Sequence, residues 1–321
     1  MSIEADAGVP SAAQATAAPA APHSRPYLWS VRRELWENHA TWIAPLAAAG
    51  FVLFGFTISL VHKPHTMKAL ASLSPEKQMA LRFAPFGIVA AALILTTVVV
   101  GIFYCLGTLY NERRDRSILF WKSMPVSDLT TVLAKATIPI VILPVIAFVV
   151  VCATQLVMLL FNSLALASHQ TELTQLWSTV PLFRLWGIIL YALVTLTLWQ
   201  APLYAYFLAL SASVKKGPFL WAVLPPIALS VFEKLAFDTS YVSNLIHDRV
   251  FGSFGAAFTG GSGHMSFGES KAGVSQHNGS FHLPVPDPAK FFTTPGLWLG
   301  LVAAVALVAL AVWLRRRREP M

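Results

Sequence analysis

Long uncharged apolar runs, separated by shorter polar segments, dominate the pattern of this 321-residue sequence. A helix needs about 20 apolar residues, at about 1.5 Å each, to cross the hydrocarbon core of a bilayer. Six runs reach or approach that length, and they cover residues 41–61, 83–110, 136–161, 185–210, 218–237 and 296–314. We therefore predict an all-α integral membrane protein with six transmembrane helices.

The run over 218–237 is the weakest of the six. It contains the pair Pro225-Pro226 and ends in Glu233 and Lys234. Proline removes a backbone donor inside a helix, so this run predicts a kinked helix whose outer end meets water or a cavity.

The distribution of Lys and Arg predicts the orientation of the spans. Basic residues near span ends favour the cytoplasmic side. With both termini cytoplasmic, the inner segments hold most of the basic residues, chiefly in the segment 111–128 and in the basic tail 315–321. Lys63, Lys68, Lys77 and Arg82, in the short first outer loop, oppose this assignment, but both termini inside remains the favoured prediction.

Composition narrows the class further, because 56% of the residues are hydrophobic and only 12% are charged. The net charge is +8, yet the basic residues lie at span ends and form no basic domain. We therefore expect anionic membrane lipids as partners and no nucleic acid. Cys105 and Cys152 lie inside predicted spans, which argues against a disulfide framework or a zinc site.

The N-terminal region divides into two parts before the first span. Residues 1–24 are rich in Ala and Pro and predict a disordered leader. The following stretch, YLWSVRRELWENHATW, predicts an amphipathic helix in the headgroup layer, flanked by Trp29 and Trp36. Its apolar stripe is formed by Leu28, Val31, Leu35 and Trp42, whereas Arg33, Glu34 and Glu37 face elsewhere. The alternative is a soluble segment that merely precedes the first span.

The connection over 238–294 is the only long loop that the pattern predicts. It starts with SYVSNLIHDRVFGSFGAAF, which fits a short amphipathic helix, and continues as a Gly-rich stretch of low complexity. Its histidines lack both a neighbouring Cys and an H-x-x-x-H spacing; they are His247, His264, His277 and His282. We therefore expect a flexible polar loop and no metal site.

A dense charge cluster lies between the second and third runs, in NERRDRSILFWKSMPVSD, residues 111–128. If this loop served only to fix the topology, its basic residues would be sufficient. That role does not explain the acidic Glu112 and Asp115 or the apolar ILFW patch. The pattern predicts a short helix from about Glu112 to Ser123 that stops at Pro125, with Ser127 or Asp128 capping the next helix. Exposed Trp and Arg together are typical of protein interfaces.

The string NERRDRSILFWKSMPVSDLTTVLAKA, residues 111–136, resembles the cytoplasmic coupling segment of bacterial ABC-2 type transporter permeases. In that family an ER-D-S-FW-K-S-PVSD pattern is followed by a helical VL-K. The layout is similar too, with an amphipathic helix, six spans over residues 25–314 and a longer connection before the last span. The outer loop does not resemble the compact outer module of the eukaryotic relatives, so nothing follows about the substrate.

The resemblance implies a permease subunit, an exporter of the bacterial inner membrane, that pairs with a second permease subunit as a homo- or heterodimer. An ABC ATPase subunit would dock on the coupling segment and move it. The residues that the resemblance and the pattern assign to this coupling are Glu112, Arg113, Arg114, Asp115, Arg116, Trp121, Lys122, Pro125 and Asp128, with Lys215 and Lys216 as a smaller second contact.

The chain itself carries no nucleotide-binding or hydrolytic motif. It has no G-x-x-x-x-G-K-[ST] loop, no G-x-S-x-G and no H-E-x-x-H. We therefore expect no catalytic residue, metal or cofactor on this chain, with ATP and Mg held by the partner. The alternatives are a membrane-embedded enzyme acting on a lipid or lipid-linked substrate, which needs clustered acid, base or metal ligands, and an ion-coupled carrier, which needs internal repeats.

Polar residues inside the predicted spans are the remaining candidates, because a charge at bilayer depth costs about 2.5–3.5 kcal/mol on insertion scales. Gln155, Gln200 and Glu233 are the pathway candidates. The two glutamines fit hydrogen bonding to a neighbouring helix equally well. Snorkelling explains Arg184, Glu233 and Lys234 near span ends.

Overall fold

The computed structural model describes residues 26–61, 75–115, 126–165, 182–259 and 284–317. Within these ranges, six helical segments are long and apolar enough to cross a membrane. They are α2 (Ala40–Val61), α4 (Pro75–Arg114), the continuous unit of α6 (Asp128–Thr137), η1 (Ile138–Ile142) and α7 (Leu143–Ala165), α9 (Leu182–Ser213), α10 (Pro218–Phe237) and α14 (Pro295–Arg317). The prediction of an all-α, multi-pass membrane protein is confirmed at this level.

Several helices extend beyond the predicted apolar runs. Helix α4 begins at Pro75, so Lys77 and Arg82 belong to a helix. The prediction that placed them in the first outer loop is wrong. The same helix continues through Arg114, so Glu112 starts no new helix, and that part of the prediction is wrong. Backbone hydrogen bonding continues past the apolar run because no Gly or Pro interrupts it there. The rest of the predicted short helix, residues 116–125, lies outside the described residues.

The third span contains a cap and an irregular turn. Ser127 is the N-cap of α6, because its side chain accepts a hydrogen bond from the Thr130 backbone N–H, as predicted. The π-helical turn η1 follows, and the Leu143 N–H reaches the Ile138 carbonyl across it. Pro139 lies in this turn and has no N–H to donate, which accounts for the interrupted α-helical pattern.

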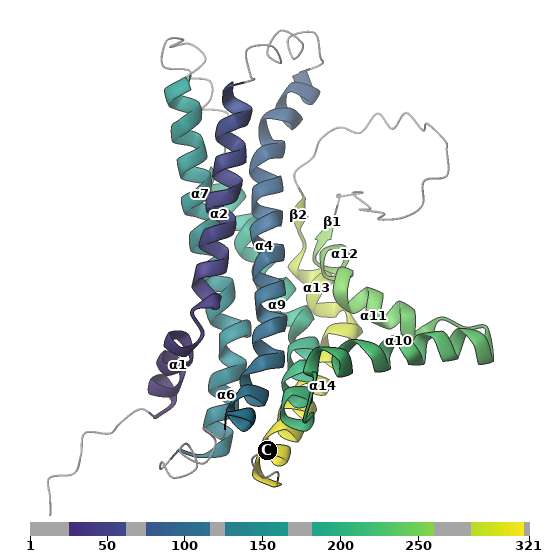
Figure 1. The fold of residues 1–321 in the computed structure, drawn as a ribbon. Coiled ribbons are helices and arrows are strands. Elements are labelled where there is room, and N and C mark those ends of the chain that lie inside the picture. Colours follow the sequence, from purple (N-terminus) through teal and green to yellow (C-terminus); the bar gives the residue numbers. More distant parts are fainter. Residues whose placement is uncertain (1–25, 62–74, 116–125, 166–181, 260–283, 318–321) are drawn as a thin grey trace, which may run out of the picture.

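The long helices form one bundle. Figure 1 shows α2, α4 and α7 side by side, with α9 and α14 beside them. The main apolar core lies between α2, α4, α7 and α9, and its most buried members include Leu93, Val151, Met158 and Leu159. Helix α14 packs along α9, where the small residues Ala201, Ala205 and Ala304 meet. Such small side chains let two helices approach closely in a membrane.

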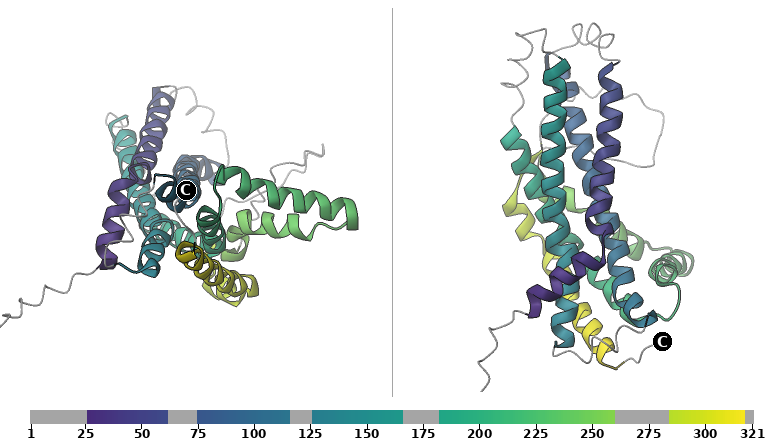
Figure 2. Two further views of the ribbon diagram at one scale, coloured as in Figure 1. Left: turned by 60° about the horizontal axis from the view of Figure 1, so that its bottom comes forward. Right: turned by 60° about the vertical axis from the view of Figure 1, so that its left-hand side comes forward.

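Helix α10 departs from the bundle. It forms a hairpin with α11 (Tyr241–Phe251), and Figures 1 and 2 show this hairpin running sideways, across the long axis of the other helices. The bounds of α10 agree with the predicted fifth span, but only Ala222 and Glu233 are buried, so few contacts hold it along the bundle. Gly217 precedes it with φ of 60°, a left-handed conformation that glycine adopts without strain.

The segment before the last span packs against the bundle. It contains α12 (Ser253–Ala257), an antiparallel pair of β1 (Phe258–Thr259) with β2 (Val285–Pro286), and α13 (Pro288–Thr293). Phe258 and Phe291 are buried with Trp199 and Leu297. The ends of the predicted loop 238–294 are therefore ordered on α9 and α14. His264, His277 and His282 lie outside the described residues.

Candidate functional site

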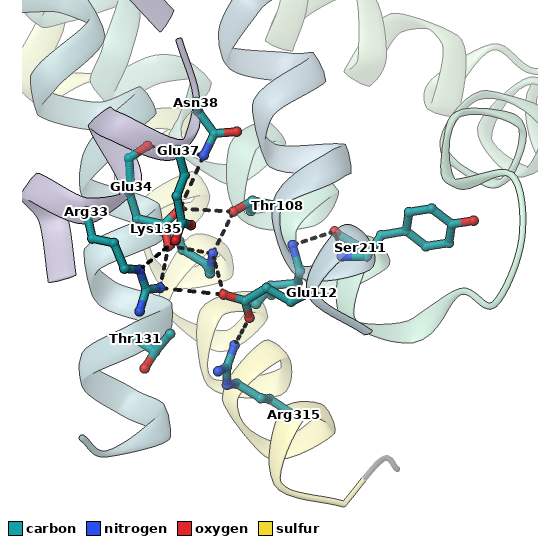
Figure 3. A network of polar contacts seen from close by, with 12 residues as sticks. Arg33, Glu34, Glu37, Asn38, Thr108, Glu112, Thr131, Lys135, Ser211 and Arg315 are labelled. Atoms are coloured by element: carbon teal, nitrogen blue, oxygen red, sulfur yellow. Dashed lines mark hydrogen bonds and ion pairs between the residues drawn. The ribbon is translucent and has the colours of Figure 1, made fainter. Parts of the chain in front are cut away.

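One end of the bundle holds a buried cluster of charged residues, which we call the charged end (Figure 3). Helices α1 (Pro26–Glu37), α4, α6 and α14 meet there. The candidate spans formed by α4, α6 to α7, and α9 are 31, 38 and 32 residues long. About 20 residues suffice to cross the hydrocarbon, so these helices are long enough to project their ends beyond it.

Lys135 of α6 is the centre of the cluster and is only 1% exposed. Its ammonium group lies 2.7 Å from a Glu34 carboxylate oxygen, 3.0 Å from Glu112 and 2.8 Å from the Thr108 hydroxyl. The contacts with Glu34 and Thr108 are hydrogen bonds, and the contact with Glu112 is an ion pair. Lys135 therefore links α1, through Glu34, to α4.

Glu34 connects α1 to the rest of the cluster. Its carboxylate also accepts hydrogen bonds from Arg33, at 2.9 Å, and from the Tyr104 hydroxyl, at 3.0 Å. Burial opposes ionisation of Glu34, but the Lys135 ammonium and Arg33 outweigh it and hold the pKa of Glu34 below its ordinary value. For Glu37, on the same helix, burial raises the pKa instead.

One side chain of α1, Glu34, lies on a face other than the predicted one. Ser30, Val31 and Glu34 are its buried residues, whereas Leu28, Trp29 and Trp36 are exposed. We predicted that Glu34 lies on a different side of α1 from the apolar stripe. It points into the bundle instead, because Lys135 and Thr108 lie there. The sequence pattern of α1 alone contains no information about these partners.

Arg315 of α14 joins the two ends of the predicted coupling segment. Its Nη1 lies 2.6 Å from a Glu112 carboxylate oxygen, and its Nε lies 3.0 Å from Asp128. Glu112 precedes the segment 116–125 and Asp128 follows it. Arg315 was expected in a basic tail, but α14 continues through Arg317 and buries this guanidinium to 4% exposure.

Arg113 connects α4 to the end of α9. Its guanidinium donates to the backbone carbonyls of Ser211 and Val214. Carbonyls at a helix C-terminus carry partial negative charge, so a cation is favourable there. The Ser211 hydroxyl in turn accepts from two backbone N–H groups of α4. Lys215 and Lys216 follow directly and are exposed, so the two predicted contact regions lie next to each other.

The residues predicted for coupling thus fall into three groups. Glu112 and Arg113 are buried and Asp128 is bonded to Arg315, so these three side chains bind inside the chain. Arg114 and Asp115 are exposed and pair with each other at 3.1 Å, and Lys215 and Lys216 are exposed as well. The remaining four lie outside the described residues; they are Arg116, Trp121, Lys122 and Pro125.

The cluster joins acids and bases through several ion pairs. Its acids are Glu34, Glu112 and Asp128, with Glu37 at its exposed edge, and its bases are Arg33, Lys135 and Arg315. Burying an ion pair gains little net stability, whereas removing one partner costs about 3–5 kcal/mol because the other charge stays buried. Such a cluster therefore fixes the relative position of its helices more than it stabilises the fold.

The pathway candidates are hydrogen-bonded within the chain. Gln155 is fully buried, donates to the Phe86 carbonyl and accepts from the Trp186 indole, which links α7 to α4 and α9. Gln200 accepts from the Tyr204 hydroxyl. Glu233 accepts from the backbone N–H groups of Tyr241 and Val242, at 2.7 and 2.8 Å, and so caps α11. These contacts give all three side chains a structural role.

Among the described residues, no group of three or more His, Cys, Asp and Glu side chains could hold a metal ion. Comparison with protein-family models, curated proteins and solved structures finds no match for this chain. The likeness to ABC-2 type permeases therefore rests on the motif in residues 111–136 and on the layout of the spans.

Sequence reasoning missed Glu34, Lys135 and Arg315 as partners of one another. One signal was present, because Lys135 stands alone as a charge within VLAKATIPI, a run that otherwise reads as the start of a span. A lone cation in such a run needs a buried acid. Glu34, in a segment expected to contact the same membrane face, was an available partner.

Proposed function

We propose that this chain is the permease subunit of an ATP-driven transporter of the ABC-2 type, an exporter in a bacterial inner membrane. A separate ABC ATPase subunit would dock on the segment 111–128, and a second permease subunit would complete the transporter. The ATPase, with its own ATP and Mg, would supply the free energy.

One observation carries the proposal most. The segment with the ABC-2-like motif is held at both ends by the same side chain, Arg315, which pairs with Glu112 before it and with Asp128 after it. A segment that only connects two spans gains nothing from a buried clamp at both ends. A segment that must transmit a force to the spans needs rigid helix ends on both sides.

The charged end would face the cytoplasm, together with both termini. It contains Arg113, Arg114 and Arg315 to Arg317, and basic residues next to spans favour the inner side. Helix α1 lies at the same end and at an angle to α2 (Figures 1 and 2). This position fits a helix in the inner headgroup layer.

The arrangement supports a specific route for the movement. A push on the segment 111–128 would displace the ends of α4 and α6, because Glu112 lies in the last turn of α4 and Asp128 is the first residue of α6. Lys135 and Arg315 would carry that displacement to α1 and α14 through ion pairs of 2.6 to 3.0 Å. The spans would then switch the facing of the dimer by rigid-body movement.

Co-purification of the ATPase tests the docking role. We expect Arg114→Glu combined with Arg116→Glu to abolish recovery of an ATPase with the tagged chain, because both changes reverse charge in the docking segment. Arg113 is left unchanged, since its guanidinium binds Ser211 and Val214 inside the chain and its loss would disturb the fold.

Arg316→Glu provides the matched control. Arg316 is exposed at the same end of the bundle, so the variant changes the charge there without touching the segment. Its ATPase recovery should equal that of the unchanged chain. Undiminished recovery with the double variant would exclude the docking role.

A further inference from the structure

Helix α1 presents a second, exposed charge site on the side opposite Glu34. Trp29, Arg32 and Trp36 stand three and four residues apart and therefore lie on one face of the helix. The Arg32 guanidinium carbon lies 5.6 Å from the centre of the Trp29 ring and 5.4 Å from that of Trp36. The two indoles are 62% and 68% exposed.

The charge of Arg32 has no acidic partner among the described residues. Arg33, next to it, pairs with Glu34, Glu37 and Glu112, whereas the ion pairs of the described chain do not include Arg32. A guanidinium held between aromatic rings is oriented by cation–π attraction, and its N–H edge stays free to donate. The group that matches such an edge is a phosphate or a carboxylate, which accepts two parallel hydrogen bonds.

The surroundings favour the phosphate of a lipid. Exposed Trp and Tyr side chains prefer the headgroup level of a bilayer, where the ring is apolar and the N–H or O–H is hydrated. Trp29 and Trp36 on α1 are exposed beside Arg32, and Trp42 at the start of α2 is exposed as well. The candidate membrane span of α2 begins at Ala40, so Arg32 stands in the helix that directly precedes a span.

We propose that Arg32, held between Trp29 and Trp36, binds the phosphate of an anionic phospholipid headgroup. This inference rests on the part of the proposed function that places α1 in the inner headgroup layer. It adds a defined lipid site with a consequence for coupling, because Glu34, two residues from Arg32, binds Lys135 at 2.7 Å. A bound headgroup would fix the position of α1. Through this ion pair it would also restrain α6, the helix that follows the segment 111–128.

Native mass spectrometry of the detergent-solubilised full chain tests the site. The chain is titrated with phosphatidylglycerol, with phosphatidylcholine and with inorganic phosphate as separate probes. A basic residue near a membrane contributes about 1 kcal/mol toward anionic lipid, so we expect Arg32→Gln to weaken phosphatidylglycerol binding about fivefold. Binding of phosphatidylcholine should stay the same, and free phosphate should bind weakly to both proteins.

Two further variants separate a built site from general charge. Arg316→Gln removes one exposed positive charge from the same end and should leave phosphatidylglycerol binding unchanged. Trp29→Leu combined with Trp36→Leu keeps an apolar face but removes the stacking, and it should weaken binding as Arg32→Gln does. All variants change exposed side chains, and an unchanged helix content verifies their folding.

Three results would overturn the proposal. They are equal binding of the two lipids by the unchanged chain, an undiminished phosphatidylglycerol affinity in Arg32→Gln, or a loss of that affinity in Arg316→Gln equal to the loss in Arg32→Gln.

The assay contains no ATPase. Failure to find an ATPase companion would therefore refute the proposed function while leaving this measurement intact.

Discussion

At the scale of residues, Lys135 decides how the charged end is assembled. It is the only lysine of the cluster and is almost completely buried. It donates to Glu34 and Thr108 and forms an ion pair with Glu112. Without this ammonium, the buried charges of Glu34 and Glu112 would be compensated, among the described residues, only by Arg33 and Arg315.

Replacement of Lys135 by Met should therefore be costly. We expect Lys135→Met to lower the free energy of unfolding by about 3–5 kcal/mol, because it removes a buried cation from between two buried carboxylates. Unfolding of the purified chain in mixed micelles measures this loss. Arg114→Met is the matched control, since Arg114 forms an exposed pair with Asp115, and solvent-exposed pairs contribute little to stability. Equal losses in the two variants would contradict the assigned role of Lys135.

At the scale of elements, Arg315 of α14 fastens the ends of α4 and α6. Its partners, Glu112 and Asp128, lie on opposite sides of the segment 116–125. This guanidinium therefore joins the two helix ends that flank the segment, in addition to the contacts of Lys135 with Thr108 and Glu112. Arg317, on the same helix, instead lies over the ring of Trp313 at 4.3 Å.

Arg315→Gln should destabilise both the end of α4 and the start of α6. We expect hydrogen exchange at residues 109–115 and 127–132 to quicken by about tenfold, the change that about 1.4 kcal/mol of lost local stability produces. Hydrogen-exchange mass spectrometry of the purified chain measures it, with Arg317→Gln as the control. Faster exchange at only one of these two helix ends would show that Arg315 does not clamp the segment as a unit.

The spans were predictable because bilayer thickness imposes a length on each apolar run. The bounds of α10 agree with the predicted run, and α9 and α14 differ from theirs by only a few residues. Helix ends were less predictable, since α4 continues to Arg114 through charged residues that are tolerated beyond the hydrocarbon. The N-cap at Ser127 was predictable, because a cap depends only on the residues within one turn.

The charged end was not predictable as a unit. Glu34 and Lys135 are 101 residues apart in the chain, and Glu112 and Arg315 are 203 apart. Periodicity and composition describe neighbours in sequence, so they carry no information about such pairs. The sideways direction of α10 is equally a matter of tertiary packing, since a helix that is apolar on all sides fits several arrangements.

At the scale of the whole molecule, the charges and the apolar surface are separated. The apolar core and the exposed apolar side chains follow the long helices, whereas the ion pairs of the described residues gather at the charged end (Figure 3). Arg114, Asp115, Lys215 and Lys216 are exposed there, before the segment 116–125 and at the α9–α10 turn. If the proposed function is right, we expect the partner ATPase to bind this surface.

Photo-crosslinking in native membranes tests this central claim most directly. A photoreactive amino acid at position 115 should crosslink the chain to a protein that hydrolyses ATP, and one at position 216 should capture the same protein. Position 164, exposed at the opposite end of α7, should capture no such protein. Absence of an ATP-hydrolysing product at both 115 and 216, or its capture from 164, would contradict the account.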